Sequence, residues 1–258
     1  MSNTKHLFAV IHIISETGIS LKERTLSQVK IAFNNGADGI FLIPAEVGIG
    51  SDDILECYYF VREAFSDKFI GINFMCDPLK ISSLIPPSLN AIWIDKGIGS
   101  TINYHILQKI RTDIIAIKLD RHEILHFGGF FFKGNNQNFP KDNETLTKLA
   151  DESSKFMDVP TTSGLGTGMS MDINQLYKIH KSMNGKPLAI ASGITCDNIL
   201  YYLPYINYFI IGSGIEKNSC DSQTIEFYKS AGIENPVEVG FLDGKKIFEL
   251  AQKIHKKI

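Results

Sequence analysis

Small residues gather at three places in the second half of the chain, each directly after a short apolar run. The segments read VPTTSGLGTG over 159–168, PLAIASG over 187–193 and YFIIGSG over 208–214. Glycine lets a main chain approach a ligand closely, and Ser and Thr hydroxyls add donors to the backbone N–H groups, which suits an anion such as phosphate. Taken alone, GLGTG matches neither a P-loop nor a full GxGxxG motif, so a tight turn also explains it. The candidate phosphate-binding residues are Ser192, Gly193, Gly212, Ser213 and Gly214, and the candidate substrate-binding residues of the first segment are Thr162, Ser163, Gly164, Gly166, Thr167 and Gly168.

Ionisable side chains follow the earlier apolar runs. The predicted catalytic residues are His12, Glu46, Asp95 and Lys133, and Asn73 is predicted to bind substrate. An acid, a cation and an imidazole together can transfer protons on a phosphorylated sugar or a similar substrate. Asp95 ends the run AIWID, where an unpartnered buried carboxylate is costly; a helix cap or a salt bridge would also explain it. Lys133 follows FGGFFF and has a structural alternative, a surface lysine lying over aromatic rings. The alternative for His12 is a hydrogen-bonded structural group.

Apolar runs alternate with helical patterns along the whole chain. The runs lie at 7–13, 39–44, 69–75, 91–95, 125–132, 159–163, 187–192 and 207–212. Several are nearly continuous in apolar residues, as parallel strands buried on both faces are. Eight such strands separated by helices predict an α/β fold, a single (β/α)8 TIM barrel over residues 1–258. In that fold the catalytic residues lie at the C-terminal ends of the strands, and the loops after strands seven and eight bind phosphate.

The segment 101–124 carries two conflicting patterns. IIAIKL over 114–119 resembles a strand, whereas isoleucines recur at helical spacing from Ile102 to Ile117. A strand at 113–119 would leave about forty residues before the run at 159, which is long for one crossover. We therefore expect a helix here and place the fifth strand at 125–132.

Composition excludes several classes of protein. With 258 residues and a net charge of −2, the chain has no electrostatic footprint for nucleic acid. Its four cysteines form no CxxC pair, which argues against a zinc or redox motif, and we predict no metal site. No apolar run approaches the length of a membrane span. We expect a cytoplasmic chain for which the sequence requires no cofactor, and homo-oligomerisation is left open.

Several segments together resemble the BtpA/SgcQ family of TIM-barrel proteins. The segments that carry the resemblance are VIHI at 10–13, GADGIFLI at 36–43, GIN at 71–73, AIWID at 91–95, FGGFFFK at 127–133, TTSGLGTG at 161–168 and PLAIASGIT at 187–195, with Asp197 and Asn198. The resemblance implies a barrel of the ribulose-phosphate-binding type with a phosphorylated small-molecule ligand. The chain departs from the family pattern at ISETG (14–18), where relatives tend toward a proline-rich turn, and at PAEVG (44–48), which puts a carried-over role for Glu46 in question.

Three functions follow from these observations. The leading prediction is a lyase, isomerase or transferase that acts on a phosphorylated small molecule such as a phosphoribosyl compound. One alternative is an FMN-dependent barrel enzyme, whose flavin phosphate would occupy the same loops. The other is a non-catalytic assembly or regulatory factor of the BtpA type that retains the ligand pocket.

Overall fold

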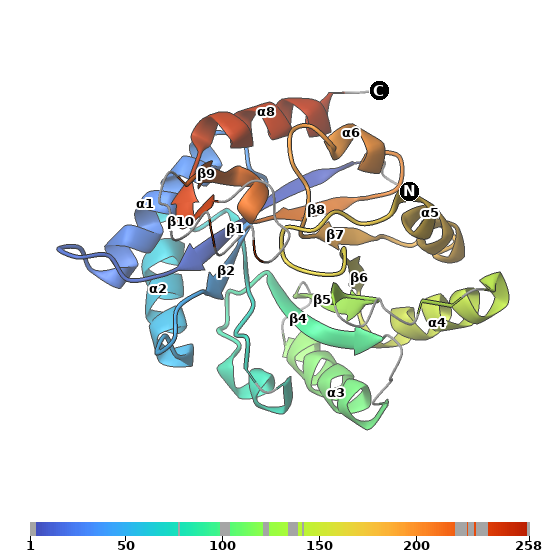
Figure 1. Cartoon of the computed structure of the whole chain (residues 1–258). Coiled ribbons are helices and arrows are strands. Elements are labelled where there is room, and N and C mark those ends of the chain that lie inside the picture. The colour runs from blue at the N-terminus through green and yellow to red at the C-terminus, as the bar shows by residue number, and fades with distance from the viewer. Residues whose placement is uncertain are drawn as a thin grey trace.

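Eight parallel strands close into a barrel in sequence order, with helices around it (Figure 1). The computed structural model describes residues 4–76, 78–98, 104–120, 124–133, 139–140, 142–219, 226, 230 and 237–256. The barrel strands are β1 (His6–Ile13), β2 (Gly39–Pro44), β3 (Phe69–Ile72), β4 (Ala91–Ile98), β5 (Leu125–Phe130), β6 (Val159–Thr162), β7 (Ala189–Ala191) and β8 (Tyr208–Ile211). The α-helices are α1 (Leu21–Asn34), α2 (Ser51–Ala64), α3 (Tyr104–Asp120), α4 (Asn143–Phe156), α5 (Ile173–Ser182), α6 (Ile199–Tyr202) and α8 (Gly244–His255), and the 3-10 helices are η1 (Pro78–Leu84) and η3 (Ser213–Ile215).

The predicted (β/α)8 barrel is confirmed, including the disputed fifth strand. Residues 125–130 form β5, and the isoleucine-rich segment before it is helix α3. The strand ends differ from the predicted ones by a few residues. In particular, β3 ends at Ile72, so Asn73 lies in the loop that follows the strand.

Local signals in the sequence explain where the helices begin and end. Ser20 caps α1 in a capping box with Glu23, and Gly36 after this helix takes a φ of +97°, which favours glycine. The Asp172 carboxylate caps α5 by accepting from the amide of Gln175. At α2, Gly50 is the N-cap and Ser51 is the first residue of the helix.

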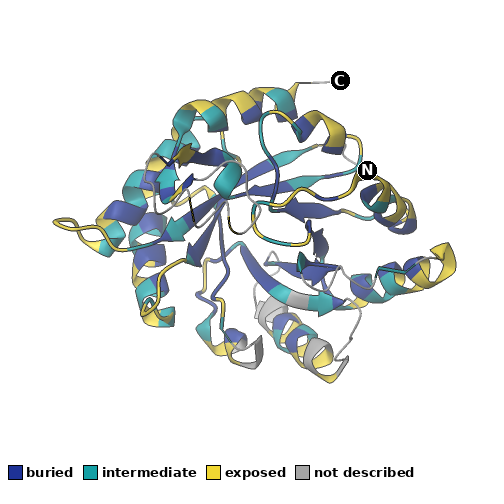
Figure 2. Cartoon of the chain, in the orientation of Figure 1, coloured by how far each residue is buried: buried dark blue, intermediate teal, exposed yellow. Residues whose placement is uncertain are grey.

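Aromatic side chains fill the barrel interior, and polar side chains lie at the C-terminal ends of the strands. Phe8, Phe41, Trp93 and Phe127 form a buried cluster in which the Phe41 ring meets the other three edge to face. Gly71 on β3 makes room for this ring, since a Cβ there would lie 2.3 Å from the Phe41 Cε1 atom. The other faces of the strands are buried against the helices, as the dark strands in Figure 2 show. This aromatic cluster fills the barrel interior, and polar groups occupy the C-terminal mouth.

An antiparallel pair of strands, absent from the eight-strand prediction, follows the barrel. β9 (Glu216–Asn218) and β10 (Val237–Leu242) form a two-stranded sheet that contacts α1 and β1. We call this pair the β9–β10 sheet. It lies beside the start of α8 in Figure 1.

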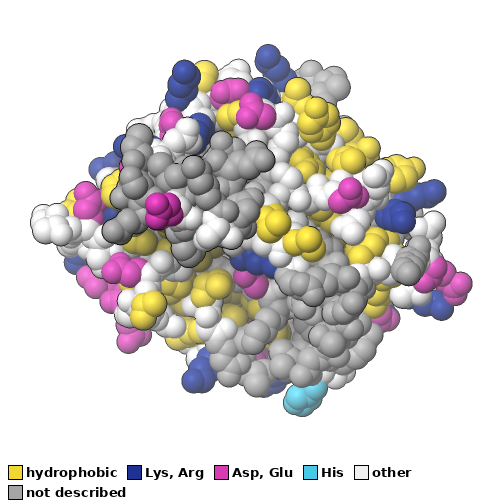
Figure 3. All heavy atoms as spheres, in the orientation of Figure 1, with side chains coloured by type: hydrophobic (Ala, Val, Ile, Leu, Met, Phe, Trp, Pro, Cys, Tyr) yellow, Lys and Arg dark blue, Asp and Glu magenta, His cyan; other side chains and the backbone are white. Residues whose placement is uncertain are grey.

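The surface carries charges of both signs. Acidic and basic side chains are interspersed on the face in Figure 3, and exposed apolar side chains gather over α5 and α6. Ile173 and Tyr177 on α5, and Leu200 and Tyr201 on α6, are exposed. Among the described helices, none is long and apolar enough to cross a membrane.

Candidate functional site

A cavity of about 220 Å³ opens at the C-terminal mouth of the barrel. Most of the strand-end side chains predicted to carry chemistry line it. These residues are His12, Asn73, Asp95, Lys133, Thr167, Ser192, Gly212 and Ser213. Trp93 and Ile210 of the buried cluster inside the barrel also line it. The mouth cavity thus combines an apolar wall with acid, cation, imidazole, amide and hydroxyl groups, which is the usual character of a small-molecule site.

Asp95 and Lys133 form the charged pair of the mouth cavity. The Lys133 Nζ atom lies 3.5 Å from Asp95 Oδ2, and the Asn73 Nδ2 group donates to Asp95 Oδ1 over 2.9 Å. Asn73 is itself held, because its Oδ1 atom accepts from the Met75 amide over 3.0 Å. The carboxylate and the ammonium are one quarter and one third exposed, so both groups are accessible from the cavity. Such a pair can transfer protons and stabilise an anionic intermediate.

Backbone strain gathers at this mouth. Met75, Phe131, Lys133 and Ser192 adopt left-handed φ values of 50°, 49°, 48° and 68°. They follow β3, β5 and β7, on the side where the cavity opens. Each left-handed non-glycine residue costs about 1–2 kcal/mol, and strain of this kind concentrates at functional sites, where surrounding structure sustains it. At Lys133, the amide donates to the Ser163 hydroxyl over 2.7 Å, which holds the strained loop in place.

The loops after β6, β7 and β8 meet backbone to backbone. A Cβ on Gly193 would lie 2.2 Å from the carbonyl oxygen of Met169, and one on Gly164 would lie 2.1 Å from the same atom. A Cβ on Gly214 would lie 1.8 Å from the Ile194 carbonyl oxygen. These approaches require glycine and bring the three predicted small-residue segments to one rim.

The rim retains unused backbone donors. Within the described part of the chain, the amides of Gly193, Gly212, Ser213 and Gly214 donate to no protein acceptor. Ser213 lines the mouth cavity and also a second, neighbouring cavity of about 690 Å³. The second cavity is lined by the loops after β6 to β8 together with α8, and its walls include Gly168, Gly193, Gly214 and Lys246. A group of neighbouring amides of this kind can bind an anion.

Five predicted residues line neither cavity, and one of them, Ser163, supports the site through hydrogen bonds. The Thr162 hydroxyl points toward Met171 of the outer core, 3.6 Å from its sulfur. The Ser163 hydroxyl accepts from the Lys133 amide and donates to the Gly164 carbonyl over 2.8 Å. The residues that the structure leaves outside both cavities also include Gly164, Gly166 and Glu46.

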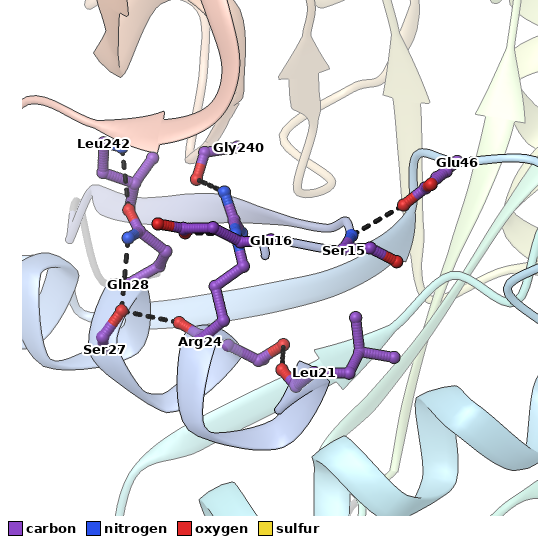
Figure 4. Close-up of polar contacts among 10 residues, drawn as sticks. Ser15, Glu16, Leu21, Arg24, Ser27, Gln28, Glu46, Gly240 and Leu242 are labelled. Carbon is purple, nitrogen blue, oxygen red and sulfur yellow. Dashed lines mark hydrogen bonds and ion pairs between the residues drawn. The ribbon is translucent and has the colours of Figure 1, made fainter. Parts of the chain in front are cut away.

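Glu46 has a structural contact of its own. Its carboxylate accepts from the Ser15 amide over 2.6 Å and so links the loops after β1 and β2 (Figure 4). That hydrogen bond lowers the pKa of the exposed Glu46 carboxyl. The sequence departure at PAEVG agrees with a role for Glu46 outside the mouth cavity.

Sequence reasoning missed Glu216, which contacts His12. The His12 Nδ1 atom lies 2.7 Å from Glu216 Oε1, and Glu216 is fully buried. The one signal in the sequence is an acidic residue directly after the buried Ile215 at the end of the GSGI segment. Within the described residues, no three His, Cys, Asp or Glu side chains are grouped so as to hold a metal ion.

Comparisons with known proteins identify the fold. No family model matches the sequence, and no curated protein matches it. Among solved structures, the chain is similar to the wild-type GGGPS from Thermoplasma volcanium, with 13% identity, a TM-score of 0.63 and coverage of 99% of this chain and 92% of that one. It is also similar to phosphoribosyl anthranilate isomerase from Thermus thermophilus, with 13% identity, a TM-score of 0.60 and coverage of 96% and 98%. The tryptophan synthase alpha chain from Legionella pneumophila matches with 12% identity, a TM-score of 0.58 and coverage of 97% and 92%. At such low identities the structural matches establish the (β/α)8 fold and no more. The resemblance to the BtpA/SgcQ family stays a prediction.

Proposed function

We propose that this protein is an enzyme that acts on a phosphorylated small molecule, such as a phosphoribosyl compound. The observation that carries the proposal is the position of Ser213, which lines both the mouth cavity and the second cavity and whose amide donates to no acceptor within the described residues; Gly193 and Gly214 line the second cavity with it. A phosphate at this rim would place the rest of the ligand next to Asp95 and Lys133. A barrel solved under the name phosphoribosyl anthranilate isomerase, and the sequence resemblance to the BtpA/SgcQ family, agree with this ligand class.

The proposed chemistry is proton transfer. Binding of the phosphate, which does not react, orients the ligand, so that the binding free energy lowers the barrier of the chemical step. Asp95 removes a proton from an acidic C–H or O–H group of the ligand, and the electron pair stays on the ligand. The ammonium of Lys133, next to this carboxylate, stabilises the resulting anion. Return of the proton to a different atom gives an isomerase, and expulsion of a leaving group by the same electron pair gives a lyase or a transferase.

Phosphate binding is tested by thermal unfolding with inorganic phosphate and a panel of sugar phosphates and nucleotides. A specific ligand raises the melting temperature by mass action. Ser213→Asp places a negative charge at the rim and should abolish the rise. Ser66→Asp is the matched control, because Ser66 is an exposed residue between α2 and β3, at the N-terminal end of the barrel. A wild-type protein whose melting temperature none of these compounds raises would end the proposal.

Catalysis is tested separately, by solvent deuterium exchange into ligands that pass the binding screen, followed by NMR. Asp95→Asn should stop the exchange while leaving phosphate-dependent stabilisation in place, because Asp95 lies outside the rim. Binding without exchange in the wild-type protein would favour the non-catalytic factor over an enzyme. A yellow purified protein would favour the FMN-dependent alternative.

A further inference from the structure

The imidazole of His12 is held by a carboxylate from outside the eight βα units. His12 lines the mouth cavity, and its Nδ1 atom lies 2.7 Å from Oε1 of Glu216, which belongs to the β9–β10 sheet. Glu216 is 0% exposed, and its Oε2 atom has no hydrogen-bond partner among the described residues. Burying a carboxylate with one oxygen unsatisfied is costly. Some other benefit must therefore accompany this contact.

Glu216 is itself fixed through the peptide groups of Gly240. The Gly240 amide donates to Glu216 Oε1 over 2.6 Å, and the Gly240 carbonyl accepts from Arg24 Nη2 over 2.9 Å (Figure 4). Arg24 is 1% exposed and its Nε atom lies 3.2 Å from Glu16 Oε2. Burial lowers the pKa of Arg24, and the negative charges of Glu16 and Glu216 offset part of that effect. Because an arginine guanidinium is not deprotonated in proteins, Arg24 remains charged.

The conformation of Gly240 makes this arrangement specific. Gly240 has a φ of +79°, and a Cβ on it would lie 3.0 Å from Arg24 Nη2 and 3.1 Å from the His12 carbonyl oxygen. Only glycine fits here without strain. The Lys246 ammonium, at the start of α8, donates to the main-chain carbonyl of Glu216 over 2.5 Å. Side chains from α1 and α8 thus hold Glu216 opposite the imidazole.

From this geometry we propose that Glu216 is a positioning residue that fixes the tautomer of His12 and makes His12 Nε2 a proton acceptor of the mouth cavity. An ionised carboxylate only accepts hydrogen bonds, so the proton of a neutral His12 must sit on Nδ1. The lone pair then lies on Nε2, which has no partner among the described residues, while the ring lines the cavity. His12 then acts as a second base beside Asp95: a proton that leaves a different atom of the ligand moves to Nε2, its electron pair stays on the ligand, and Glu216 stabilises the imidazolium. Among the described residues, the charged groups of this environment include Glu216, with Arg24 behind it, and Asp95 and Lys133 in the same cavity.

This inference rests on the proposed function for its chemical meaning, and its test needs no ligand. The full-length protein labelled with ¹⁵N-histidine gives the tautomer of each ring from long-range ¹H–¹⁵N correlation spectra, and the His12→Gln variant assigns the His12 signals. We expect the Nδ1–H form in the wild-type protein at a pH where the ring is neutral. Glu216→Ala should shift His12 toward the Nε2–H form, whereas Glu216→Gln should keep Nδ1–H, since its amide oxygen still accepts. Glu249→Ala, which removes an exposed glutamate on α8, is the matched control.

The wild-type spectrum alone can overturn the inference, even if Glu216→Ala does not fold. A wild-type His12 in the Nε2–H form, or a tautomer that Glu216→Ala leaves unchanged, would refute it. In the deuterium-exchange assay Glu216→Ala should lower the rate about 100-fold at the ligand position that His12 deprotonates, the scale of a lost general base, without changing the rise in melting temperature with phosphate. A wild-type protein with the Nδ1–H tautomer but no stabilisation by any phosphate compound would refute the proposed function and leave the tautomer assignment intact.

Discussion

Replacing Gly193 with alanine tests the convergence of the loops at the rim. Gly193 has a φ of +69°, and its added Cβ would lie 2.2 Å from Met169 O and 2.4 Å from the carbonyl carbon of the same residue. An alanine in the left-handed region costs about 1–2 kcal/mol. Because the obstacle is backbone, the loop after β6 must move, and overpacking of this kind adds about 1–3 kcal/mol. The free energy of unfolding should fall by about 2–5 kcal/mol in total.

Thermal and denaturant unfolding measure this loss against a matched control. For a chain of this size, 1 kcal/mol corresponds to about 2–4 °C in melting temperature, so Gly193→Ala should melt roughly 4–20 °C lower. Gly48→Ala is the control, because Gly48 has a φ of +102° and nothing within 4 Å of its Cβ position. It should lose only the backbone cost of about 1–2 kcal/mol. The difference between the two variants therefore isolates the contact between the loops after β6 and β7.

Phosphate provides the second measurement on the same pair of variants. At ten times its dissociation constant, phosphate should stabilise the wild-type protein and Gly48→Ala by about 1.4 kcal/mol. Gly193→Ala should lose this gain, because displacement of the loop separates the amides of Gly193, Ser213 and Gly214. If Gly193→Ala is no less stable than Gly48→Ala, the loop contact is absent. If it is less stable but still gains the full 1.4 kcal/mol from phosphate, these amides do not form the anion site.

Three further predictions concern other parts of the site. Gly212→Ala should change the free energy of unfolding by less than about 1 kcal/mol, because the nearest atom to its Cβ would be His12 Cε1 at 3.2 Å. The new methyl group in the mouth cavity should nevertheless slow deuterium exchange. Unchanged exchange would argue against this cavity as the reaction site. Gly240→Ala should destabilise the fold by about 2–5 kcal/mol in urea unfolding, since a left-handed alanine there meets Arg24; a loss below about 1 kcal/mol would contradict the geometry. Burial raises the pKa of the Cys196 thiol to about 11. The rate of its alkylation by iodoacetamide, measured by mass spectrometry, should therefore still rise about tenfold per pH unit between pH 8 and 10. A rate that levels off near pH 9 would show an ordinary thiol.

The strands could be predicted because burial on both faces leaves a direct mark in the sequence. Residues such as Ile40, Phe41 and Leu42 are all fully buried, alternately against the helices and inside the barrel, and so appear as an unbroken apolar run. The helix α3 could be distinguished from a strand by the four-residue spacing of its isoleucines, two of which, Ile110 and Ile114, are buried. The ends of the strands were less predictable. A strand ends where its backbone hydrogen bonds to the neighbouring strand end, and the residues of the strand itself do not determine that point.

The positions of the site residues followed from a rule about the fold, and their contacts did not. Parallel strands of a barrel end at one face, so Asp95 and Lys133 were expected on the same side, whereas their separation of 3.5 Å depends on the strained backbone at Lys133. The same rule placed Glu46 at this face. Its side chain instead binds the Ser15 amide, because the loop after β2 folds toward the loop after β1. A strand-end position therefore predicts the face of the barrel on which a side chain lies, and loop conformation decides whether it enters the cavity.

Glu216 could not be predicted from any spacing, for a physical reason. A single glutamate after a buried isoleucine is unremarkable in a sequence, and the cost of burying it is several kcal/mol unless other groups compensate. The compensating groups come from distant parts of the chain: His12 on β1, Arg24 on α1 acting through Gly240, and Lys246 on α8. No local pattern links them, since each contact exists only after the β9–β10 sheet has docked against the finished barrel. Among the described residues one carboxylate oxygen of Glu216 has no hydrogen-bond partner, which costs stability next to the mouth cavity. Local sequence rules are expected to fail at sites where function accounts for such a cost.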